Sequence, residues 1–179
     1  MEINEQISSI KKSFFSYRNG VVSTSLRAAG DPHRYIMGCM LPDIAQIAQQ
    51  FMPDARLASA LWAEKEHREC RIAATMLYPI DELDFSTAVE WCNDVENKEI
   101  ADVLCMKLLR YFNQADKLWL HLINEKSEIN QYIGLRLLAN LLTIGRLSLT
   151  DNISHALNDY AASTSSAGLK SFAISLTED

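Results

Sequence analysis

The sequence predicts an all-α protein, an α-α superhelix of stacked antiparallel helix pairs. One observation is an internal repeat: residues 61–77 and 122–138 align without a gap and share five identical positions. Each stretch has a helix end, a charged turn and a second helix, and a unit of roughly 30 residues made of two helices is typical of HEAT-like and armadillo-like solenoids. The second observation is that apolar residues recur three or four positions apart along nearly the whole chain, without a sustained alternating run. The identical pairs are Leu61/Leu122, Glu64/Glu125, Lys65/Lys126, Ile72/Ile133 and Leu77/Leu138.

The first part of the chain, residues 1–52, is expected to form an N-terminal helical cap. Apolar residues over 3–17 lie three or four positions apart, which gives the first helix one apolar face. An Asn-Gly pair ends this helix, and a short second helix over 21–29 ends at a Gly-Asp-Pro sequence. A loop over 31–40 follows, and Pro42 then opens the next helix, where its missing N–H costs nothing.

Stacked helix pairs are expected over residues 53–179, within a single domain of residues 1–179. The segment over 133–142 is apolar on more than one side, which indicates a buried helix. The apolar faces of the expected pairs are 57–62 with 72–76, 89–92 with 100–111, 118–123 with 133–142, and 153–161 with 169–176.

Composition favours a cytoplasmic protein without a membrane span or a cofactor. Apolar residues make up 48% of the chain, which is enough for one sizeable core. No apolar run approaches the ~20 residues of a membrane span, and the acidic, amphipathic start lacks the layout of a signal peptide. The four cysteines share no metal-ligand spacing with the four histidines, so we expect reduced core thiols and no metal site. The sequence also lacks phosphate-binding glycine motifs and a nucleophile elbow.

The charge balance argues against a surface that coats DNA uniformly. The net charge is −6, whereas nonspecific binding to a duplex comes from Lys and Arg that displace counterions. The charge is uneven, however. Residues 11–34 contain five basic residues and one acid, and residues 81–99 contain seven acids and one lysine. A local basic patch is therefore still compatible with the composition.

Asp102 is the most suggestive polar residue, because it interrupts the apolar helical stretch over 100–104. An unpaired carboxylate there would be costly if buried, so it faces water, a partner or a cleft. Lys98 lies one turn earlier on the same face, and the plain interpretation is an i,i+4 ion pair. If Asp102 acts on a ligand, we expect it to be accessible and without a partner from a neighbouring repeat. If it is structural, a neighbouring repeat should supply a donor that buries it.

Two further polar groups have plain interpretations as well. Glu69 and Arg71 lie at the start of an expected inner helix, where Glu favours the positive helix end. His33, Arg34 and Tyr35 form a basic-aromatic loop that could touch phosphate or a base, or simply connect two helices.

The runs RNGVVSTSLRAAG, LPDIAQIAQQF and ALWAEKEHRECRIAATML resemble the DNA alkylation repair enzyme family, the AlkD-like DNA glycosylases built from HEAT-like repeats. The resemblance extends over about residues 7–109 and more loosely beyond. It implies a concave, basic groove that takes DNA.

Four functional positions are implied by this resemblance. In active members, a tryptophan and an aspartate four residues apart flank the lesion's backbone, and an arginine and a second tryptophan follow on later repeats. The match puts Lys98 at the first tryptophan and Asp102 at the aspartate, with Ile133 at the arginine and Ile174 at the second tryptophan. Asp102 is thereby expected to stabilise the positive charge that develops on the deoxyribose as an alkylated purine leaves.

Three functions follow as hypotheses. The first is a family member that binds DNA, including damaged DNA, in a concave groove and has weak or no N-glycosylase activity. The second is a noncatalytic helical-repeat module for a protein or peptide, which the acidic balance favours. The third is an active glycosylase that releases N3- or N7-alkylated purines from a rearranged site with Asp102 and Lys98. DNA contacts are expected from Arg27, Arg34, Lys98, Lys107 and Arg110.

Overall fold

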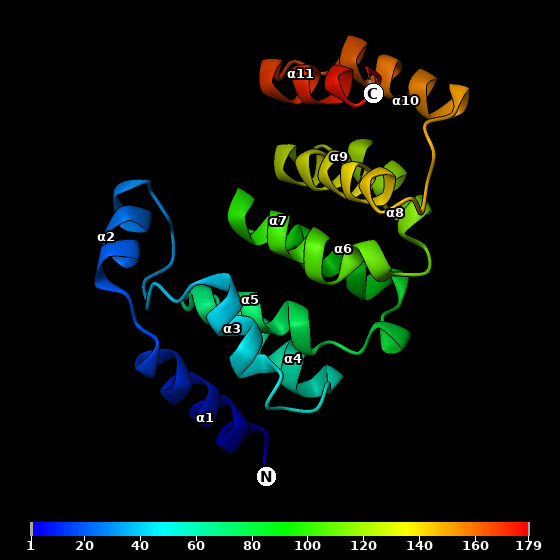
Figure 1. Cartoon of the computed structure of the whole chain (residues 1–179). Helices are drawn as coiled ribbons and strands as arrows, with labels where there is room; N and C mark the ends of the chain where they lie inside the picture. The colour runs from blue at the N-terminus through cyan, green and yellow to red at the C-terminus, as the bar shows by residue number, and fades with distance from the viewer. Residues whose placement is uncertain (1, 179) are drawn as a thin grey trace. The chain divides into compact units, whose positions relative to one another are not determined.

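The protein is all-helical over the residues that the structure describes, 2–178. In this computed structural model, α-helices α1 to α11 and two 3-10 turns follow one another (Figure 1). Apart from an isolated bridge between Tyr35 and His67, the described residues form no β-structure, and the predicted all-α class is confirmed.

The chain divides into two compact units, Met1–Leu83 and Asp84–Asp179. The single domain over 1–179, with a helical cap over 1–52 and stacked helix pairs over 53–179, stays a prediction. None of the described helices is long and apolar enough to cross a membrane.

A hairpin of two helices forms the centre of the first unit. Its members, α4 and α5, pack along each other, with α1 against α4 and α3 against α5. The apolar stripe of α1 is buried at Ile7, Ile10 and Phe14, as its spacing predicts, whereas α2 buries none of its residues. The elements are α1 (Ile3–Ser16), α2 (Gly20–Ala28), α3 (Leu41–Ala48), α4 (Ala55–Trp62), α5 (Arg68–Leu77) and η1 (Ile80–Glu82).

A buried carboxylate ties the loop over 31–40 to the start of α5. Glu69 accepts hydrogen bonds from the backbone N–H groups of Met37 (3.1 Å) and Gly38 (2.9 Å) and from the guanidinium of Arg68 (2.9 Å). Gly38 has φ +76°, and a Cβ there would lie 2.2 Å from the carbonyl oxygen of Asn19. Both the backbone angle and the close approach therefore require glycine at this position.

Arg71 belongs to the core of the same unit. Its side chain is fully buried, its guanidinium lies 3.6 Å from the centroid of the Trp62 ring, and it donates to the Trp62 carbonyl at 2.7 Å. Glu69 and Arg71 are thus buried side chains that pack and form hydrogen bonds inside the first unit.

Helix α9 lies at the centre of the second unit (Figure 1). Helices α10 and α11 pack along each other, and α6 contacts α8 and α9. Helix α9 packs along α8 and also against α7 and α11. Its buried residues include Ile133, Leu137, Leu138 and Leu141, as the apolar segment predicts. The elements are α6 (Phe85–Asn93), α7 (Lys98–Lys107), η2 (Leu109–Tyr111), α8 (Ala115–Ile123), α9 (Glu128–Thr143), α10 (Asp151–Ser163) and α11 (Ala167–Ser175).

The repeated stretches fold as helix–turn–helix segments in both units. Residues 61–77 cover the end of α4 and all of α5, and residues 122–138 cover the end of α8 and most of α9. The shared apolar positions are buried in both copies, whereas the shared glutamates form different exposed pairs: Glu64 with Lys11 (2.9 Å) and Glu125 with His121 (3.3 Å). The repeat therefore preserves the helix-pair core, and the surface of each copy differs.

Gly134 allows α9 to approach α8 closely. A Cβ at this position would lie 2.8 Å from the Ile123 side chain and 2.9 Å from the Trp119 carbonyl oxygen. Real Cβ atoms do not come so close, so any larger residue would push the two helices apart.

We expect Gly134→Ala to lower the free energy of unfolding by about 1–3 kcal/mol, because an overpacked contact forces the backbone to shift. Gly168→Ala is the matched control, since a Cβ there meets open space, and its better helix propensity should raise stability by up to about 1 kcal/mol. Urea unfolding followed by circular dichroism measures both. Equal effects of the two changes would contradict the close α8–α9 contact.

Candidate functional site

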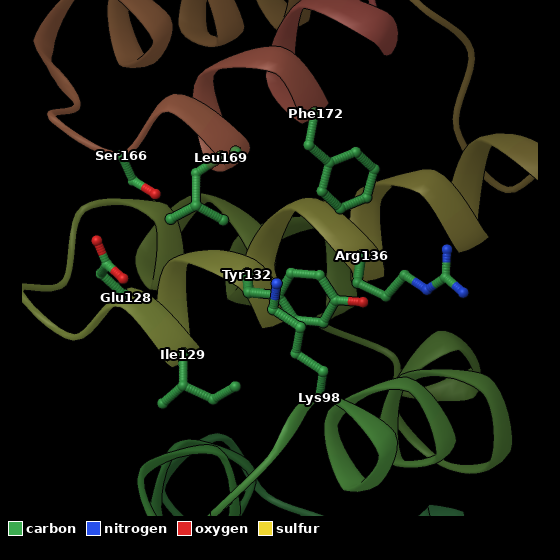
Figure 2. A pocket seen from close by; sticks show the side chains of 9 residues that line it. Lys98, Glu128, Ile129, Tyr132, Arg136, Ser166, Leu169 and Phe172 are labelled. Carbon is green, nitrogen blue, oxygen red and sulfur yellow. The ribbon is translucent and has the colours of Figure 1, made fainter. Parts of the chain in front are cut away.

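A cleft of about 550 Å³ opens in the second unit between side chains from α7, α9 and α11. Figure 2 shows Phe172 reaching from α11 toward Tyr132, and Lys98 reaching toward the same tyrosine from α7. Ile129 and Leu169 add apolar surface. The cleft combines cations, aromatic rings and one acid; its polar and aromatic lining residues are Lys98, Glu128, Tyr132, Arg136, Ser166 and Phe172.

Asp102 is held beside this cleft by two donors on α9. Its Oδ1 accepts a hydrogen bond of 2.7 Å from the Tyr132 hydroxyl and forms an ion pair of 2.9 Å with Nε of Arg136. Among the described residues, none donates to its Oδ2. The side chain is 35% exposed. Both donors thus contact the same carboxylate oxygen, and the side chain stays partly exposed.

Two expectations about Asp102 are therefore corrected. It has partners from the neighbouring helix pair, and its ion pair is with Arg136 rather than with Lys98. The physical reason is that α9 packs against α7, and Tyr132 and Arg136 are one helical turn apart on the same face. The donors nevertheless leave the carboxylate partly exposed, so it is neither unpartnered nor buried.

The Tyr132 hydroxyl is fixed as a hydrogen-bond donor. Burial, the hydrogen bond to Asp102 and the negative charge of that carboxylate together raise the pKa of Tyr132 well above its ordinary value of 10. The phenol therefore stays protonated at neutral pH and orients the carboxylate, as a positioned donor does in other polar networks.

Lys98 contacts an aromatic face instead of a carboxylate. Its Nζ lies 5.0 Å from the centroid of the Tyr132 ring, a cation–π distance. Within the described part of the chain, no acid forms an ion pair with this amine. Phe172 packs on the same tyrosine, with ring centroids 5.9 Å apart. Tyr132 thus links the lysine, the carboxylate and the second aromatic ring.

The last two positions implied by the resemblance, Ile133 and Ile174, do not line the cleft, and nearby residues on the same helices do. Ile133 is fully buried in the core, and Arg136, three residues on, is the residue that reaches Asp102. Ile174 lies on α11 outside the cleft lining, and Phe172 supplies the aromatic ring. Tyr132, Arg136 and Phe172 were missed by sequence reasoning, although a tyrosine and an arginine at i,i+4 on the inner helix are a visible signal.

The remaining cations of the second unit lie away from the cleft lining. Lys107 is the last residue of α7, nine positions along the helix from its first residue, Lys98, so the two lie about 14 Å apart along the helix axis. Arg110, in η2, stacks on Tyr111 with 4.7 Å to the ring centroid and hydrogen-bonds to its hydroxyl. Lys98, Lys107 and Arg110 therefore do not form one local cluster.

Arg27 and Arg34 do lie together in the first unit. The guanidinium of Arg27 donates to the carbonyl of Arg34 at 3.1 Å. The Arg34 side chain is 68% exposed, 3.7 Å from Glu66 and over the Tyr35 ring. Tyr35 in turn stacks on His67, with ring centroids 4.4 Å apart. Arg34 and Tyr35 are thus exposed, and Glu66 partly offsets the charge of Arg34. His33 is buried instead, with its Nδ1 atom 2.6 Å from the carboxylate of Asp31.

Metal and thiol chemistry find no support in the described residues. No group of three or more His, Cys, Asp or Glu side chains among them could hold a metal ion. All four cysteines are free and buried. Burial, with the nearby acids, raises the pKa of Cys39 and Cys70 to about 12, so neither is a nucleophile at neutral pH.

We expect Tyr132→Phe to lower the free energy of unfolding by about 1–2 kcal/mol, because it removes a hydrogen bond to a charged group. Tyr111→Phe, which removes an exposed phenol, should change it by less than about 0.5 kcal/mol. The double variant Tyr132→Phe/Asp102→Asn should lose less than the sum of the single changes. Additive losses in thermal or urea unfolding would contradict the coupling of these two side chains.

The sequence profile described as "DNA alkylation repair enzyme" matches residues 10–164. Among curated proteins and among solved structures, no match to the chain was found. The profile covers most of the chain and includes Lys98, Asp102, Tyr132 and Arg136. The chain belongs to the DNA alkylation repair enzyme family, and its role is in alkylation repair.

Proposed function

We propose that the protein binds DNA, including alkylated duplex, at the cleft of the second unit, with weak or no N-glycosylase activity. The observation that carries this proposal is the orientation of Asp102: Tyr132 and Arg136 hold Oδ1, and Oδ2 accepts no hydrogen bond from the described residues. A carboxylate oxygen positioned in this way can stabilise positive charge on a deoxyribose as its base departs.

The lining of the cleft suits a nucleic-acid strand. Lys98 and Arg136 supply positive charge for phosphate oxygens. Tyr132 and Phe172 supply ring faces, and stacking of a base on an aromatic side chain is worth about 1–3 kcal/mol. Arg27 and Arg34 form a second cationic group on the first unit. These features give an acidic chain local surfaces that can take DNA.

The same contacts limit the catalytic power of Asp102. The Arg136 guanidinium, 2.9 Å away, offsets the negative charge that would stabilise the transition state. Each 1.4 kcal/mol of stabilisation lost in this way reduces the rate about tenfold. Lys98 occupies the position of an aromatic wall and adds a further positive charge near the departing cationic base. Release of alkylated purines is therefore expected to be slow.

A protein or peptide partner is the second candidate. The net charge of −6 and the exposed apolar side chains of the first unit favour it, since Val21 on α2 and Met52 are 81% and 83% exposed. An active glycosylase with a rearranged site, using Asp102 and Lys98, is the third. Binding and base-release measurements separate the three functions.

Fluorescence anisotropy with duplexes that contain or lack a methylated purine tests the proposal. Binding should weaken by about tenfold to a hundredfold between 50 and 200 mM salt, because a few phosphate contacts release counterions. Lys98→Gln should reduce the log–log salt slope by about 1. The exposed Lys117 on α8 lies outside the cleft lining, and Lys117→Gln should leave the slope unchanged.

Base release from the methylated duplex distinguishes the remaining functions. Slow or undetectable release, lost further in Asp102→Asn, agrees with the proposal. Rapid release that needs both Asp102 and Lys98 would favour the active glycosylase. Binding that is absent at 50 mM salt, or that does not respond to salt, would contradict DNA binding and favour a protein partner.

A further inference from the structure

Lys98 places a primary amine inside the cleft. It is the first residue of α7 and lines the cleft, where its amine lies over the Tyr132 ring (Figure 2). Lys11, by contrast, forms an ion pair with Glu64 at 2.9 Å. Arg136 and Tyr132 both donate to Oδ1 of Asp102. Asp102 is the i,i+4 neighbour with which Lys98 would be expected to pair on an isolated helix. The Lys98 amine is thereby left available inside the cleft.

We infer that Lys98 forms an imine with the C1′ aldehyde of an abasic deoxyribose in DNA, and that the protein cleaves the strand on the 3′ side of that sugar. This inference rests on the proposed function, because the same cleft must take the DNA strand. Abasic deoxyribose is the product left when an alkylated purine departs, and its ring-opened form carries an aldehyde at C1′. A primary amine is the side chain that reacts with a carbonyl to give an imine.

The reaction balances without a cofactor. The Lys98 ammonium first gives a proton to water, and the lone pair of the amine then adds to C1′ to form a carbinolamine. The carbinolamine takes up a proton from water on its hydroxyl group and loses water, which gives a protonated imine. The imine makes the C2′ proton acidic, and a base removes it. The electron pair of that C–H bond forms the C2′=C3′ double bond, and the C3′–O bond breaks with the 3′ phosphate as leaving group. Water then hydrolyses the imine and releases the amine.

The neighbours of Lys98 suit each step. The positive imine would lie over the Tyr132 ring face, which stabilises cations. Asp102 lies one turn along α7, and its Oδ2, which accepts no hydrogen bond from the described residues, can take the C2′ proton. Arg136 lines the same cleft, and its guanidinium offers donors to the departing phosphate.

Trapping with sodium cyanoborohydride tests the inference on the full chain. A duplex with one abasic site should give a covalent protein–DNA product, and peptide mass spectrometry should locate the adduct on Lys98. Lys98→Arg keeps a positive charge beside the aromatic ring, and its trapping is compared with the natural chain at protein concentrations that saturate the duplex in both. Its yield of trapped product should fall by at least about tenfold, because a guanidinium does not form the imine.

Lys117→Arg is the matched control, and its trapped yield and strand cleavage should equal those of the natural chain. A normal melting temperature of Lys98→Arg excludes misfolding as the cause of a loss. DNA binding without trapping, trapping unaffected by Lys98→Arg, or an adduct at another amine would overturn this inference and leave the proposed function standing. Absence of duplex binding at 50 mM salt in the anisotropy measurement would overturn both.

Discussion

The close contact of α9 with α8 at Gly134 determines where the side chains of the cleft point. Because the α9 backbone lies against the Trp119 carbonyl and the Ile123 side chain, the rotation of α9 about its axis is fixed by packing. That rotation directs Ile133 into the core and Tyr132 and Arg136 toward Asp102 on α7. The site is thus a consequence of helix packing, with its polar contacts made between neighbouring helix pairs.

The carboxylates of Glu69 and Asp102 differ in how many of their oxygens accept hydrogen bonds and in how exposed they are. Glu69 is buried, and both of its oxygens accept hydrogen bonds, from two backbone N–H groups and from Arg68. Asp102 is partly exposed, and its two donors share one oxygen. A fully satisfied buried acid holds a loop in place, whereas a half-satisfied, accessible acid keeps an acceptor for a ligand.

The charges around Tyr132 bear on which reaction the cleft could support. With Arg136 on Asp102, the carboxylate is less negative toward a ligand, and a purely electrostatic role is weakened. The same ion pair leaves the Lys98 amine over an aromatic ring without a carboxylate partner. The arrangement thus agrees with both proposals, slow release of alkylated bases and an amine that reacts with the abasic sugar.

The sequence by itself determined the all-α class, the helix–turn–helix repeat, the buried character of the 133–142 segment and family membership, because apolar spacing and repeated positions are local properties of the chain. It also singled out Asp102 and Lys98. Only the tertiary structure decided that Asp102 pairs with Arg136 and Tyr132, that Ile133 faces the core, and that Phe172 lines the cleft. Those contacts join residues about 30 or more positions apart in the sequence. They also depend on the rotation of α9 about its axis, which the close packing at Gly134 sets and no local sequence pattern specifies.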